Sequence, residues 1–155
     1  MVNRIAGGLF VLAACILGSV VGAHAQDVEV GVIRNASGTV SIVRDGTEIP
    51  AAIGESVLHN DVIETGPDGT VGIVLADTSQ ISLGPMTEFH LEEFEFEPLQ
   101  QQYSFLARII QGSLVYISGD IGRLSPDDVR IEIPWGAIGL RGTRIAVSAT
   151  PPGQP

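Results

Sequence analysis

Three polar side chains that lie close together in the sequence, Ser56, His59 and Asp61, are of the types used in nucleophilic catalysis. A serine hydrolase needs a hydroxyl, an imidazole that takes its proton and a carboxylate that orients the imidazole. Nothing around Ser56 resembles the strained strand-to-helix turn of a nucleophile elbow. Residues 59–61 are therefore interpreted as a polar turn between two apolar pairs, and a hydrolase is kept only as a remote alternative.

The stretch HLEEFEFEP, residues 90–98, offers His90 and four glutamates as a cradle for a divalent cation. Its apolar residues occupy odd-numbered positions before Glu92 and even-numbered positions after Glu93. A β-bulge with one extra residue would cause this switch of the apolar face. Alternate glutamates on a strand stand about 7 Å apart, so they cannot converge on one ion without another strand. We therefore expect Glu93, Glu95 and Glu97 to line a solvated strand face, and we predict neither a metal nor another cofactor.

A third candidate is IPWGAIGLRGTRIAV, residues 133–147, where three glycines interrupt two apolar runs. A phosphate-binding loop would need a helix after it, and the residues from Thr143 to Val147 alternate like a strand. We expect Pro134 to end one strand and the glycines, Gly136, Gly139 and Gly142, to allow positive φ where the backbone doubles back.

The possible partner contacts of the chain lie in the same stretch: Trp135, Arg141, Gly142 and Thr143. The guanidinium of Arg141 can donate to nearby carbonyls or carboxylates, which makes it an internal clamp, or it can contact an anion or a partner. Trp135 is either a core residue or an exposed contact, and we expect it to be partly buried. No P-loop, paired CxxC or HExxH is present, so the sequence predicts a protein that is not an enzyme.

The first 25 residues have the features of a signal peptide: one positive charge, an apolar run and Ala23-His24-Ala25 as a cleavage site. Cys15 could instead be lipidated, or the segment could remain as an uncleaved anchor. Each of these alternatives predicts export to the periplasm or the exterior of a bacterial cell. The expected divisions are 1–25 signal peptide, 26–37 N-terminal strand, 38–148 β domain and 149–155 disordered tail.

Cleavage after Ala25 leaves a chain without cysteine or lysine, in which seven arginines stand against 18 aspartates and glutamates, a net charge of −11. Binding to nucleic acid depends on clustered cations that release counterions, so nucleic acid is not expected as a partner. The same charge argues against binding to an anionic membrane surface. A membrane association is expected only through Cys15 or an uncleaved N-terminal segment.

Apolar residues alternate with polar ones through most of the remaining chain, and turn signals such as Asp45-Gly46 recur about every 8–12 residues. This rhythm is typical of an all-β domain. The stretch from Tyr103 to Gln111 could form a short helix, but the β-branched residues that follow Gly112 favour a strand.

Four segments, GTVSIVRDG (38–46), 53–87, IIQGSLVYI (109–117) and 133–147, resemble in their order the FecR domain family. That family's pattern includes a "gD-x-I-x-T" element, a "DGS-x-I-x-L" turn and strand, a "GxL" segment and a closing "RGT". Thr78 stands here where the family usually has glycine. The residues that fit are Asp61, Ile63, Thr65, Asp77, Ser79, Ile81, Leu83, Gly112, Leu114, Arg141, Gly142 and Thr143.

The resemblance implies an all-β domain, either β-solenoid-like or a rolled stack of short strands. It also implies an extracytoplasmic module best known in regulators that sense transporter occupancy and control a sigma factor. We expect the module alone, without the anti-sigma and transmembrane parts of those regulators. The function expected first is an exported binding or scaffold module that recognises an envelope protein or a cell-wall polymer. The alternative is an accessory in signalling between a TonB-dependent receptor and a sigma factor.

Overall fold

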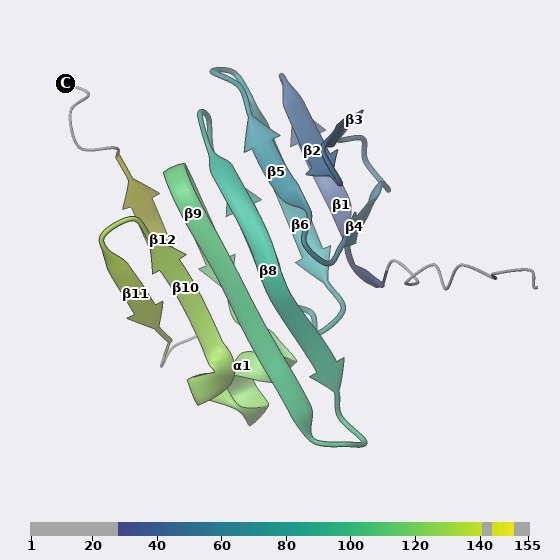
Figure 1. Cartoon of the computed structure of the whole chain (residues 1–155), viewed down its shortest axis with the longest axis vertical. Helices are drawn as coiled ribbons and strands as arrows, with labels where there is room; N and C mark the ends of the chain where they lie inside the picture. The colour runs from purple at the N-terminus through teal and green to yellow at the C-terminus, as the bar shows by residue number, and fades with distance from the viewer. Residues whose placement is uncertain (1–27, 141–143, 151–155) are drawn as a thin grey trace, which may run out of the picture.

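The computed structural model describes residues 28–140 and 144–150, and these form one strongly curled sheet of twelve strands with two short helices. In Figure 1 the strands β8 and β9 run side by side through the middle of the molecule. Within the described residues, no helix is both long and apolar enough to cross a membrane. The elements are β1 (Glu29–Ser37), β2 (Val40–Arg44), β3 (Thr47–Pro50), β4 (Ser56–Leu58), β5 (Val62–Thr65), β6 (Thr70–Leu75), β7 (Gln80–Leu83), β8 (Glu88–Glu97), β9 (Gln102–Ile117), α1 (Asp120–Leu124), the 3-10 helix η1 (Pro126–Asp128), β10 (Val129–Ile133), β11 (Gly136–Gly139) and β12 (Arg144–Ala149).

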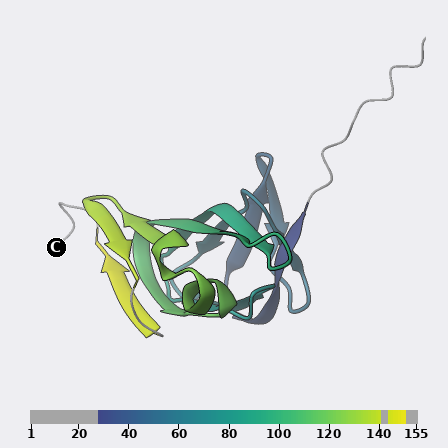
Figure 2. The ribbon, with the colours of Figure 1, turned by 90° about the horizontal axis from the view of Figure 1, so that it is seen from below.

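The strand order is β3-β2-β5-β8-β9-β7-β6-β1-β4, and β10 and β12 also pair with β9. All neighbours are antiparallel except β9 and β10, which are parallel. Figure 2 shows how the sheet curls around its interior as a half-barrel. The expectation of an all-β fold is therefore confirmed, and of the two expected arrangements the structure has the rolled sheet.

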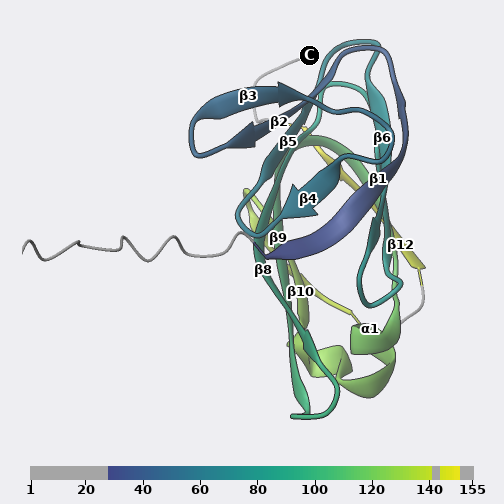
Figure 3. The same ribbon diagram turned by 90° about the vertical axis from the view of Figure 1, so that its right-hand side faces the viewer.

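The curled sheet has two halves, one that contains β8 and one that contains β7 and β12. The strand β9 belongs to both. Its residues 102–111 pair with β8, whereas residues 112–117 pair with β12 and residues 114–117 with β7. The change of direction falls at Gly112, whose φ is +95°. A Cβ atom there would lie 2.2 Å from Oγ1 of Thr87 and 2.4 Å from its Cα, so only glycine fits this bend. In Figure 3, β8, β9 and β10 lie along one side and β6 and β12 along the other, with α1 at one end.

Apolar side chains from both halves point inward and form one core. The alternation seen in the sequence places every second residue of β6, β7 and β12 inside. Phe105 and Tyr116 stack at the centre with ring centroids 5.0 Å apart. Burying such a side chain contributes about 1.5–3 kcal/mol, so a core of this kind can hold the domain together without disulfides.

Several local expectations are confirmed. Asp45 and Gly46 join β2 to β3 with φ values of +50° and +75°, the backbone of a tight hairpin turn. The pairing of β8 with β9 shifts register between Leu91 and Glu93, where the bulge is predicted. Residues 103–111 belong to strand β9.

The glycine-rich stretch after Pro134 differs from its prediction. Gly136 and Gly139 do not form a bend: they begin and end β11, an extra strand that pairs antiparallel with β10. Neither has a positive φ, and a Cβ atom at either position would meet nothing within 4 Å. The doubling back takes place earlier, at Pro134 and Trp135, so two of the three glycines were assigned the wrong role.

Candidate functional site

The proposed triad of Ser56, His59 and Asp61 does not assemble. The hydroxyl of Ser56 donates to Oε2 of Glu29 at 2.5 Å. Nδ1 of His59 contacts the side-chain amide of Asn60 at 2.8 Å, so this imidazole bonds to its sequence neighbour instead of to serine or aspartate. The three residues lie at β4 and in the polar turn before β5, as the turn interpretation predicts.

Asp61 has a structural partner that the sequence interpretation missed. Its carboxylate is completely buried and accepts hydrogen bonds from Nε of Arg44 at 2.9 Å and from Nη2 at 2.8 Å. It also accepts the backbone N–H of Leu58 at 2.8 Å, while the same guanidinium donates to the carbonyl oxygen of Ser56. A buried charge is tolerated only when it is paired and hydrogen-bonded in this way. The arrangement ties β2 to the turn between β4 and β5.

The glutamates of β8 are distributed among separate partners. His90 contacts Glu88 at 2.9 Å, and Arg108 on β9 forms ion pairs with Glu92 at 2.9 Å and with Glu132 at 2.8 Å. The hydrogen bond to Glu132, followed by the charge of Glu92, raises the pKa of Arg108.

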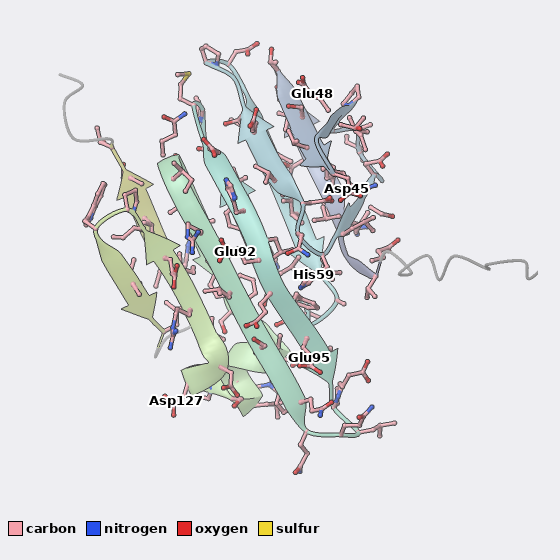
Figure 4. All side chains as sticks on the ribbon, viewed as in Figure 1. Asp45, Glu48, His59, Glu92, Glu95 and Asp127 are labelled. Atoms are coloured by element: carbon pink, nitrogen blue, oxygen red, sulfur yellow. The ribbon has the colours of Figure 1, made fainter. Side chains whose placement is uncertain are left out.

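The carboxylates farther along β8 stay apart from one another. Figure 4 shows Glu92 and Glu95 separated along this strand, and Glu93, Glu95 and Glu97 are exposed, as expected for a solvated strand face. Among the residues that the structure describes, no three His, Cys, Asp or Glu side chains come close enough together to hold a metal ion.

A second buried aspartate, Asp77, organises the turn between β6 and β7. Its carboxylate accepts the backbone N–H of Ser79 at 3.0 Å and its hydroxyl at 2.6 Å, and it accepts the N–H of Ile121 at 3.2 Å. The Ser79 hydroxyl also lies 3.1 Å from that of Tyr116. Burial raises the pKa of Tyr116, and its bond to Ser79 opposes that rise.

These contacts explain why the aspartate and serine of the "DGS"-like element occur together. They connect the β6–β7 turn to the start of α1, where the N–H of Asp120 also donates to the backbone oxygen of Asp77 at 2.7 Å. Thr78, between them, has a φ of +69°, a conformation that glycine adopts without strain. Asp77 and Ser79 are both completely buried, and their side-chain oxygens are engaged in these structural hydrogen bonds.

Trp135 lies in the turn that joins β10 to β11, and 56% of its surface is exposed. It is therefore not a core residue: it is partly covered, as expected, and more than half of it is open to solvent. The other possible contacts, Arg141, Gly142 and Thr143, lie outside the described residues. Leu140, immediately before them, is buried.

The sequence model described as FecR protein matches residues 61–153, which is more than half of the chain. The chain belongs to the FecR family. The matched range begins at the buried Asp61 and includes Asp77, Ser79 and Gly112, the residues with the structural roles described above. No curated protein and no solved structure matches the chain.

FecR domains are regulatory and non-enzymatic, they are related to signalling, and in their family context they lie outside the cytoplasm. The strands β1 to β4 precede the matched range, yet they belong to the same sheet: β1 pairs with β6 and β4, and β2 pairs with β5 and β3. The folded FecR domain of this chain therefore extends toward the N-terminus beyond the part that the family match covers.

Proposed function

We propose that this FecR-family chain is an exported binding module that recognises another envelope protein through the β10–β11 hairpin. The observation that carries the proposal is the exposure of Trp135 at the tip of this hairpin. Tryptophan is among the residues that contribute most to protein interfaces, because its large rigid surface is removed from water on binding. Pro134 precedes it, and its fixed φ limits the backbone freedom of the turn that carries the indole.

The sequence neighbours of Trp135 favour a protein over a cell-wall polymer. A sugar-binding site combines an aromatic ring with polar side chains that converge on the hydroxyl groups of the ligand. The residues next to Trp135 are Pro134, Gly136 and Ala137, none of which has a polar side chain. Arg141, Gly142 and Thr143, which lie outside the described residues, stay predicted partner contacts.

The test is a capture experiment with the mature chain immobilised and exposed to solubilised envelope extract. We expect a specific protein to be retained by the native chain and lost with Trp135→Ala. Leu99→Ala is the matched control, since Leu99 is fully exposed in a different loop, and this variant should retain the partner. Binding of isolated cell-wall polymer instead of protein, or equal capture by both variants, would contradict the proposal.

A second candidate is favoured by membership in the FecR family: an accessory in transmembrane signalling that works with separate anti-sigma and transporter proteins. In that case the partner captured through Trp135 belongs to the signalling system. Deletion of the gene should then change transcription of a neighbouring operon, and the Trp135→Ala allele should reproduce the change. Unchanged transcription in the deletion strain would exclude this role.

A further inference from the structure

Four strands of the described sheet, β3, β4, β11 and β12, pair with only one neighbouring strand. Each therefore has a free edge with backbone N–H and C=O groups that another strand could bind. Proteins usually protect such edges with proline, charged side chains or very short strands. The four edges differ sharply in this protection.

Three of the edges are poor templates. The strand β3 has four residues and contains both Glu48 and Pro50, which lacks a backbone donor. The strand β4 has only three residues, and the N–H of Leu58 is already bonded to Asp61. The strand β11 is four residues long and has glycine at both ends, which weakens it as a strand.

The strand β12 has none of these features. Its sequence, RIAVSA, contains no proline or glycine and only one charge, on Arg144. All six residues pair with β9 without a register shift, from Arg144 opposite Ile117 to Ala149 opposite Gly112. The side chains of Val147 and Ala149 are buried, whereas Arg144, Ala146 and Ser148 are exposed on the outer face. The edge is thus long and regular, and no other described strand pairs with it.

Charge is distributed very unevenly among the strands of this acidic chain. The strands β6, β7 and β12, with residues 112–117 of β9, contain a single charged residue, Arg144. The strand β8 in the other half contains five glutamates. Two copies of a chain with a net charge of −10 repel each other through the acidic half. The half that ends in β12 is where they can approach.

We propose that β12 pairs antiparallel with β12 of a second copy, about a two-fold axis at Ala146. In this register Arg144 of one copy lies opposite Ser148 of the other, and the two Ala146 side chains face each other. Opposed residues of an antiparallel pair share a face of the sheet. The exposed side chains of β12 in one copy therefore lie on the same face as the exposed side chains of β12 in the other copy.

This arrangement brings no like charges together. The two Arg144 residues stand four positions apart along the joint, about 13 Å at the rise of a strand, which exceeds the screening length at physiological salt. Each guanidinium faces the end of β12 where Met86, Gln111, Gly112 and Ser148 line a shallow hollow. The edge can therefore pair with itself through backbone hydrogen bonds without bringing like charges together, as a two-fold contact requires. Because the joint is short, we expect a weak dimer that dissociates on dilution.

Sedimentation equilibrium of the mature chain tests the proposal between about 1 and 300 µM. We expect a concentration-dependent dimer that Ala146→Lys abolishes, because two ammonium groups would then meet on the axis. Ala137→Lys places the same charge on the exposed edge strand β11 and should leave the dimer intact. Circular dichroism and thermal melting establish that both variants are folded.

A gain of affinity gives a further test that misfolding cannot imitate. Ser148→Asp would place a carboxylate opposite Arg144 at both ends of the joint, and the dimer should tighten several-fold at low salt. A native chain that remains monomeric throughout the concentration range would overturn the proposal. A dimer unaffected by both β12 variants would overturn it as well. The inference is independent of the partner site, because Trp135→Ala should leave the dimer unchanged.

Discussion

Arg44 and Asp61 form a two-point ion pair in which the carboxylate is completely buried and the arginine side chain is 21% exposed. The pair joins β2 to the turn that precedes β5, at the first residue of the FecR match. The ion pair therefore links the N-terminal hairpin of β2 and β3 to the rest of the sheet.

Removing the charge of Asp61 should therefore destabilise the whole domain. Breaking a buried ion pair costs about 3–5 kcal/mol, and because Arg44 keeps some contact with solvent we expect about 2–3 kcal/mol for Asp61→Asn. Urea unfolding followed by circular dichroism measures the change. Glu95→Gln, on the exposed face of β8, is the control and should alter stability by less than about 0.5 kcal/mol.

The glycines at positions 112 and 136 should respond oppositely to alanine. Gly112→Ala puts a methyl group within 2.4 Å of the Thr87 backbone at a φ of +95°, so we expect a loss of about 3 kcal/mol or more. Gly136→Ala meets no atom within 4 Å and should be neutral, or stabilising by about 0.5 kcal/mol. Thermal unfolding compares the two variants, and equal melting temperatures would contradict the assigned bend.

Replacing Thr78 by glycine should stabilise the protein. A β-branched residue at a φ of +69° is strained by about 1–2 kcal/mol, and glycine relieves this strain. Because glycine also makes the unfolded chain more flexible, the net gain should be about 0.5–1 kcal/mol. Thr70→Gly, in the extended strand β6, has no strain to relieve and should lower the melting temperature.

The contribution of Asp68 to stability should depend on pH. Its carboxylate accepts the backbone N–H of Thr39 at 3.2 Å, and this bond lowers the pKa of Asp68 below its usual value of 3.8. A lowered pKa in the folded state means that the contribution is present above about pH 4 and is lost as the pH falls through the folded pKa. The difference in unfolding free energy between the native chain and Asp68→Asn should therefore be larger at pH 7 than at pH 3.

Much of the local structure could be predicted because short-range rules determine it. The Asp45-Gly46 hairpin depends on the φ preferences of two residues, and the bulge before Glu93 follows from a change of parity in the same strand. The polar turn at residues 59–61 follows from its composition. In each case the residues concerned are adjacent, so no knowledge of the wider sheet is needed.

The long-range features could not be predicted. Arg44 and Asp61 are 17 residues apart, and their contact exists only because β2 pairs with β5. Asp77 reaches the N–H of Ile121, 44 residues away, through the curl of the sheet. Gly136 and Gly139 were assigned to a bend because glycine favours turns, but glycine is also tolerated in an exposed edge strand with no close neighbour. The exposure of Trp135 likewise depends on the hairpin that these glycines complete.

The sharing of β9 between the two halves has a consequence for how the domain opens. The strands β8, β7 and β12 all pair with β9, so each half of the sheet depends on this strand. Detaching β9 from β8 therefore also disturbs the pairing of β9 with β7 and β12 beyond Gly112. Backbone amides on both sides of the bend should consequently exchange with deuterium at one common rate, through a single cooperative opening of the half-barrel.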